Sequence, residues 1–191
     1  MKLWQKESTS VSELVERFTV GRDREFDLLL AQYDVEGSIA HVTMLGEVGL
    51  MTKEEAQQAV TALQEILKEV RRSKFKIEDG IEDVHSQVEF LLTQRIGDIG
   101  KKIHSGRSRN DQVAVDIKLF LRAQVLEVKD AVTQLFELLI QQSEKYKDKL
   151  LPGYTHFQLA MPSSFGLWFG AYAESLVDDL EVLAAAYTVA N

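Results

Sequence analysis

The chain has 191 residues, 45% of them hydrophobic and 27% charged, and a formal net charge of -8. This composition is typical of a globular chain with a sizeable core, and the acidic balance argues against general nucleic-acid binding. The absence of cysteine excludes disulfides and thiolate metal sites, so we expect a reducing, cytoplasmic compartment. The first residues lack an apolar signal segment and no run approaches about 18 apolar residues, so we expect neither secretion nor a membrane span.

Apolar periodicity predicts helices along most of the chain. Thr52 and Glu55 have the spacing of a capping box, and apolar residues then recur at helical spacing as far as Val70. The segment 71–80, RRSKFKIEDG, breaks this pattern and is predicted to be a loop. Another helix is predicted to begin near Asp83, and the glycine-containing stretch that follows it, up to residue 110, is predicted to be irregular.

Two long helices are predicted in the second half of the chain. Apolar residues from Val113 onward predict one helix that ends near Tyr146 and is roughly 50 Å long. The segment LLPGYTHFQLAMP is predicted to be a turn, with Pro162 in the first turn of the second helix. No strand is predicted. We expect an all-α fold with an N-terminal helical domain (1–108) and the start of a central long-helix bundle (109–191), in a chain truncated from a longer protein.

The segment HSGRSRN, residues 104–110, concentrates positive charge and hydrogen-bond donors just before the first long helix. Its two guanidinium groups suit carboxylate or phosphate ligands, and a helix N-terminus adds free N–H groups. One interpretation is therefore an anion-binding loop. The other is a solvated basic loop, and the spacing alone does not separate the two. A nucleotide-phosphate loop is not predicted, because the GxxxxGK[ST] pattern is absent.

Two further segments carry histidine beside other polar residues. EDVHSQVE places His85 at a helix start, which indicates either a site residue or an exposed histidine next to the helix cap Asp83. PGYTHFQ places His156 in a turn, where it is either a site residue or bonded to the backbone. No HExxH pattern or paired-carboxylate spacing supports a metal site among the histidines.

Four segments in order resemble the argininosuccinate lyases and the related delta-crystallins, within the aspartase and fumarase superfamily. HSGRSRNDQV is similar to their GRSRNDQ segment, PGYTHFQLAMP to GYTHLQ-A-Q-P, and EDVHSQVE to ED-H--(I/V)E. YDVEGSIAHVTML resembles their D-x-G-S-x-A-H helix, and KLW at residues 2–4 matches as well. The resemblance extends over essentially the whole chain.

The resemblance implies a carbon–nitrogen lyase that cleaves argininosuccinate to arginine and fumarate by anti β-elimination. It implies homotetramers whose active sites combine segments of different subunits, and it implies no metal or organic cofactor. Such a site must stabilise the aci-carboxylate formed when a proton leaves the neighbouring carbon, and must protonate the departing nitrogen. By resemblance His156 is the catalytic residue. The substrate-binding residues that it implies are Ser105, Arg109, Asn110, Thr155, His85 and Gln158.

Departures from the family pattern limit what the resemblance carries over. Asp23 and Glu25 stand where family members have substrate-binding serines, and QLAMPSS replaces QRAQPI. The flexible GSS-x-M-P-x-K-x-N loop, which carries the family's presumed base, is absent, so residues 1–191 alone are expected to be inactive. Two alternatives stay open: another succinyl or fumaryl lyase of the superfamily, and a catalytically silent structural protein of the delta-crystallin kind.

Overall fold

The computed structural model describes residue 18 and residues 21–191, so the matching segment at residues 2–4 lies outside the described part. The chain divides into two compact units, one up to Phe120 and one from Leu121 to Asn191. The division falls inside the long helix α6. The elements are α2 (Asp23–Glu47), α3 (Lys53–Arg71), α4 (Val84–Ile96), α5 (Asp98–Lys101), η1 (Lys102–His104), α6 (Arg109–Lys145), β1 (Leu150–Thr155), β2 (Gln158–Ser164) and α7 (Phe165–Val189).

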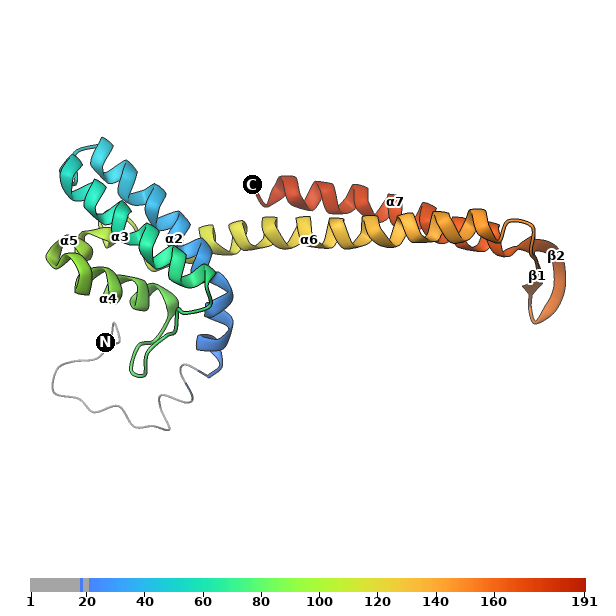
Figure 1. Ribbon diagram of the computed structural model, residues 1–191, viewed down its shortest axis with the longest axis horizontal. Coiled ribbons are helices and arrows are strands. Elements are labelled where there is room, and N and C mark those ends of the chain that lie inside the picture. Colours follow the sequence, from blue (N-terminus) through green and yellow to red (C-terminus); the bar gives the residue numbers. More distant parts are fainter. Residues whose placement is uncertain (1–17, 19–20) are drawn as a thin grey trace. The chain divides into compact units, whose positions relative to one another are not determined.

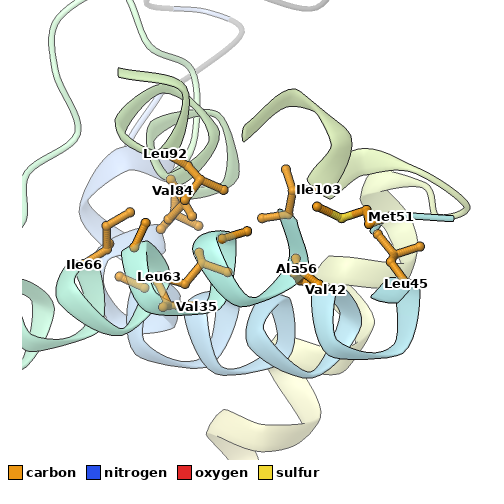
Figure 2. Close-up of a cluster of buried hydrophobic side chains, with 14 of the residues drawn as sticks. Val35, Val42, Leu45, Met51, Ala56, Leu63, Ile66, Val84, Leu92 and Ile103 are labelled. Carbon is orange, nitrogen blue, oxygen red and sulfur yellow. The ribbon is translucent and has the colours of Figure 1, made fainter. Parts of the chain in front are cut away.

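The core of the first unit forms where α2, α3 and α4 pack together (Figure 2). Helix α3 begins at the predicted capping box: Thr52 Oγ1 accepts from the Glu55 backbone N–H at 3.1 Å, and the Glu55 carboxylate accepts from the Thr52 N–H at 3.1 Å. Such a cap stabilises a helix by about 1 kcal/mol. The fully buried core side chains include Val35, Val42, Leu45, Leu63, Ile66, Val84 and Leu92.

The region between α4 and α6 differs from the sequence prediction. Asp83 caps α4, as predicted, with its carboxylate accepting from the Ser86 N–H at 2.7 Å. The stretch predicted to be irregular instead contains the short helices α5 and η1. Gly100 makes this possible, because a Cβ there would lie 2.7 Å from the Thr93 backbone nitrogen. The short helix α5 is therefore held directly against the backbone of α4, a close approach that periodicity does not reveal.

The second unit is an antiparallel pair of helices joined by a β-hairpin (Figure 1). Helix α6 ends at Lys145, close to the predicted end, and α7 returns along it. Near the hairpin, Ser143 Oγ donates to the Gly166 carbonyl at 2.7 Å. A Cβ on Gly166 would lie 2.6 Å from the Lys147 Cα, so glycine at this position permits the close approach of the two segments. At the other end of the pair, Arg122 donates to the Tyr187 hydroxyl at 3.0 Å.

The hairpin corrects the expectation that the chain has no strands. Strands β1 and β2 pair antiparallel over Leu150–Thr155 and Gln158–Ser164. Pro162 lies in β2 opposite Pro152, not in the first turn of α7. The helix begins later because Ser164 Oγ accepts from the Leu167 N–H at 3.1 Å and caps α7. Two prolines fit this hairpin because both strands of a two-stranded sheet are edge strands. Proline has no N–H to donate, and an edge strand tolerates that loss.

Many large apolar side chains on the long helices are exposed. Leu135 and Leu138 on α6 have exposed fractions of 47% and 50%, and Leu167 and Trp168 on α7 have 69% and 45%. Exposed apolar surface of this extent on a helix pair is typical of an interaction face. None of the described helices is long and apolar enough to cross a membrane.

Candidate functional site

A buried polar junction lies where α2, α4 and α6 meet inside the first unit. It consists of Asp34, His85, Gln112 and Asp116, each no more than 6% exposed. His85 Nδ1 lies 2.8 Å from Asp34 Oδ1, and Gln112 Nε2 donates to the same oxygen at 3.1 Å. Asp116 Oδ2 lies 3.6 Å from His85 Nδ1. One imidazole nitrogen therefore faces two carboxylates in a site that water hardly reaches.

Helical periodicity places these side chains together. Asp34 and Ser38 are four residues apart on α2, and Gln112 and Asp116 are four residues apart on α6, so each pair lies on one helix face. His85 lies in the first turn of α4, where the cap at Asp83 sets the start of the helix. His85 is buried, so the expectation of an exposed histidine beside the cap was wrong.

Burial and neighbouring charge set the protonation of the junction. Burial, followed by the charge of Asp34, raises the pKa of Asp116 to about 7, so that this carboxyl is about half protonated near neutral pH. Burial by itself lowers the pKa of His85, but the hydrogen bond to Asp34 and the charges of Asp34 and Asp83 outweigh it. The pKa of His85 is therefore raised above its ordinary value, a shift that favours the imidazolium.

Asp34, His85 and Asp116 are also residue types that bind metal ions, and their possible ligand atoms lie within 4.8 Å of one another. Their geometry is nevertheless that of a hydrogen-bond chain. The Nδ1–H of His85 points at Asp34 Oδ1, and the Gln112 amide donates to that same oxygen. A nitrogen that donates a proton has no lone pair to offer a metal there.

The arginines of the HSGRSRN loop bind the helices around the junction. Arg107 Nη2 donates to Ser38 Oγ at 3.1 Å, and burial lowers the pKa of Arg107. Arg109 Nη1 lies 3.1 Å from Asp83 Oδ1, and Nη2 donates to Ser86 Oγ at 3.3 Å. The Nε atoms of both arginines are buried without a hydrogen-bond partner in the described part of the chain. The two guanidinium groups are therefore held inside the unit and are not freely solvated.

The remaining polar side chains of the loop point away from this network. Ser105 and Asn110 are exposed. The loop backbone is nevertheless fixed: His41 Nε2 donates to the Ser105 carbonyl at 2.9 Å, and the Asp111 carboxylate accepts from the Ser108 N–H at 2.7 Å. Burial, with the charge of Arg107 adding to it, lowers the pKa of His41, which agrees with a neutral ring donating to a carbonyl. The loop thus presents exposed donors on a well-held backbone.

The other predicted site residues lie on the hairpin of the second unit. Thr155 pairs with Gln158, and His156 and Phe157 form the two-residue loop between them. Both loop residues have positive φ, 48° and 63°, as a type I′ turn requires. Glycine or asparagine normally occupies such positions, so histidine and phenylalanine are strained there. The side chain of His156 is exposed and makes no hydrogen bond among the described residues, so the backbone-bonded interpretation was wrong.

Within the first unit, the structure brings His85 and Arg109 to the same end of α4. Asp34, Gln112 and Asp116 were not predicted from the sequence. The sequence did contain a hint for Asp34 and Asp116. Each occupies a position on the buried face of its helix, where acidic residues are rare unless they are paired.

Asp23 and Glu25 lie in the first turn of α2, and Glu25 forms an exposed ion pair with Arg22 at 2.8 Å.

The helical fold is that of the fumarase and aspartase type of lyase, and residues 6–191 match the model of the family described as Lyase. The chain belongs to this lyase family. It is 64% identical over 190 residues to the argininosuccinate lyase of Bacteroides fragilis, an alignment that covers 100% of this chain and 42% of that protein. The chain therefore spans less than half the length of this curated relative. The expected family is confirmed.

Solved structures confirm the expected fold class. An EDDS lyase in complex with formate superimposes with a TM-score of 0.73 at 25% identity, covering 95% of this chain and 36% of that one. A fumarate lyase:delta crystallin from Brucella melitensis gives a TM-score of 0.72 at 16% identity, covering 95% of this chain and 47% of that one. At this identity the second likeness shows the fold alone.

Proposed function

We propose that the full-length protein to which this chain belongs cleaves argininosuccinate to arginine and fumarate by anti β-elimination. The observation that carries the proposal is the 64% identity to an argininosuccinate lyase over the whole of this chain. The well-held loop at the start of α6 adds support, because it combines exposed donors with two arginines. Argininosuccinate carries several carboxylates, and carboxylates are the groups that guanidinium groups and hydrogen-bond donors of such a loop bind well.

The exposed donors are assigned to the substrate. Ser105 and Asn110 would donate to a carboxylate, and Thr155 and Gln158 would contact the succinyl part of the substrate. Donors placed where charge develops on the aci-carboxylate lower the barrier more than they tighten ground-state binding. His156, whose exposed ring has no partner among the described residues, would act in proton transfer.

Arg109 and His85 are also assigned to substrate binding, although both side chains lie mostly inside the first unit. The guanidinium of Arg109 already binds Asp83 and Ser86, so a substrate carboxylate would share it with these groups. In this proposal, Arg109 both holds the loop in place and supplies positive charge. His85 is assigned to substrate binding, and its raised pKa favours the charged ring that suits an anionic substrate.

Further parts of the proposal come from the family resemblance. They are a homotetramer with active sites shared between subunits, a cytoplasmic location, a reaction without metal or organic cofactor, and a catalytic base outside residues 1–191. The exposed apolar faces of α6 and α7 support assembly, because such faces pack against other helices in bundles. The division into domains at residue 108 also stays a proposal.

The test is a direct assay of the purified full-length protein with argininosuccinate, following fumarate by its ultraviolet absorbance. Fumarate and arginine formed in equal amounts would support the proposal. Fumarate from another succinyl compound, but not from argininosuccinate, would favour a sister lyase. A folded tetramer that releases fumarate from neither would favour the structural protein of the delta-crystallin kind.

A further inference from the structure

The two nitrogens of His85 have different surroundings. Nδ1 faces Asp34 Oδ1 at 2.8 Å and Asp116 Oδ2 at 3.6 Å. Nε2 has no hydrogen-bond partner among residues 18 and 21–191. A hydrogen bond at one ring nitrogen determines what the other can do, so the contact with Asp34 leaves Nε2 as the only nitrogen that His85 can offer to a ligand.

We propose that Asp34 and Asp116 are positioning residues that hold His85 as an imidazolium, whose Nε2–H binds a carboxylate of the substrate. This inference rests on the proposed function, because it concerns how the same substrate is held. The Asp34 carboxylate at 2.8 Å, joined by Asp116 at 3.6 Å where that group is ionised, attracts the ring's positive charge in a site with little water, where such attraction is strong. The amide of Gln112 fixes Asp34 Oδ1 in place at 3.1 Å, so the ring orientation is fixed as well.

Other charged groups around the ring also act on the protonation of His85. Helix α2 contributes Asp27 as well as Asp34, and Asp83 precedes α4. Arg109, in the first turn of α6, opposes a positive ring, and Arg107, in the loop before it, lowers the pKa of Asp116. The charge of Arg109 is offset by its ion pair with Asp83, while Arg107 donates to the neutral Ser38 hydroxyl. The hydrogen bond to Asp34 and the charges of Asp34 and Asp83 together outweigh burial and Arg109, so the pKa of the ring is raised.

The assignment restricts what His85 can do in the reaction. An imidazolium has no lone pair at Nε2, so it cannot remove a proton from carbon. It can donate a charge-assisted hydrogen bond, which is roughly twice as strong as a neutral one and suits an anionic group. His85 therefore binds and orients an anion, and the role of base falls to another residue.

The decisive variant is Asp34→Asn in the full-length protein. The amide keeps an acceptor for Nδ1–H but removes the charge, so the pKa of His85 should fall. At about pH 8 the variant's KM for argininosuccinate should exceed the wild-type value, by up to roughly tenfold for each unit by which the pKa of His85 falls, with kcat changed much less. At about pH 6, where a larger fraction of the ring is protonated in either protein, the difference in KM between variant and wild type should narrow. Glu47→Gln, an exposed acid-to-amide change on the same helix, should leave KM unchanged at both pH values.

A merely structural Asp34 would give a different pattern. Its loss would reduce the folded fraction, and KM would not recover at low pH; that result, in protein shown to be folded by circular dichroism, would overturn the proposal. If Asp34→Asn does not fold, Asp116→Asn takes its place. It should raise KM only above about pH 7, where the wild-type carboxyl is ionised, and an unchanged KM there would count against the proposal.

A measurement without substrate separates this inference from the proposed function. Nitrogen-15 spectra of histidine-labelled full-length protein, with the His85 signal identified by its loss in His85→Gln, report which ring nitrogens are protonated. His85 should carry protons on both nitrogens at neutral pH in the wild type and lose the Nε2 proton in Asp34→Asn. A neutral His85 in the wild type would refute the inference, whether or not the protein cleaves argininosuccinate. A charged His85 in a protein that releases no fumarate would refute the proposed function alone.

Discussion

Arg109 and Asp83 form an ion pair between the first turn of α6 and the residue that caps α4, with Nη1 3.1 Å from Oδ1. Both side chains are largely covered, with exposed fractions of 19% and 22%. The same Asp83 oxygen accepts from the Ser86 backbone N–H, so one carboxylate both caps α4 and holds the arginine of the loop. The positive segment noticed in the sequence is thus connected to a specific acid 26 residues earlier in the chain.

A double-mutant cycle should measure this connection. Asp83→Asn keeps a capping oxygen but loses the charge, and Arg109→Ala removes the partner. We expect a coupling free energy of about 1–2 kcal/mol in denaturant unfolding of the full-length protein, because the pair is mostly shielded from water. The exposed pair Asp98 and Lys101 serves as the control and should show no measurable coupling. Equal coupling free energies for the two pairs would mean that Arg109 does not hold the loop.

Arg109→Ala should also reduce catalysis. If Arg109 supports a loop that receives a multiply anionic substrate, kcat/KM for argininosuccinate should fall at least about 100-fold, or about 2.7 kcal/mol on the barrier. Asn110→Ala should act mainly on KM. Wild-type efficiency in both variants would show that the loop takes no part in substrate binding.

His156→Asn tests the hairpin tip. Asparagine tolerates positive φ better than histidine, so the midpoint of thermal unfolding should stay the same or rise slightly. The kcat should fall strongly, because asparagine cannot transfer a proton at neutral pH.

Phe157→Gly is the matched companion variant at the same turn. It relieves the backbone strain without changing the imidazole, and should stabilise the hairpin by about 1 kcal/mol with kcat near the wild-type value. A histidine with a purely structural role would give the opposite result for His156→Asn, with stability lost and kcat retained in the folded fraction.

The pKa of Asp116 makes the stability depend on pH. Because the folded-state pKa of about 7 exceeds the ordinary value of 3.8, the folded protein binds more protons than the unfolded chain between these values. The contribution of this group to stability is complete below about pH 4 and is lost as the pH rises through about 7. His85, whose pKa is also raised, acts in the same direction above its ordinary value of 6.5.

Asp116→Asn should therefore flatten this dependence. Between about pH 5 and 8 the wild-type thermal midpoint should decline, and the variant should decline less and be the more stable protein at the upper end. Thermal unfolding followed by circular dichroism at several pH values checks this. A wild-type midpoint that rises over this range would mean that Asp116 is ionised in the folded state throughout.

The 191-residue chain alone should be inactive and self-associating. The exposed apolar side chains along α6 and α7, such as Leu135 and Leu167, make contiguous faces of a kind that drives association. Light scattering of the purified chain and a fumarate assay provide the measurements. A monodisperse chain that produces fumarate would place the catalytic base among residues 1–191.

The sequence by itself was enough for the helical class, the family, the caps at Thr52 and Asp83, and the extent of α6. These features depend on interactions between residues three or four positions apart, or on contiguous motifs, and both are visible in one dimension. The hairpin was missed because its turn contains His156 and Phe157, without the glycine or asparagine that usually marks a type I′ turn.

Only the tertiary structure determined which charged side chains contact one another. Asp34, His85 and Asp116 come from three helices and are separated by 51 and 31 residues along the chain, so no local pattern connects them. Their burial follows from the packing of α2, α4 and α6, and that burial turns ordinary acids and a histidine into a group with shifted pKa values. Charge depends on distance and on access of water, and both are properties of the folded chain.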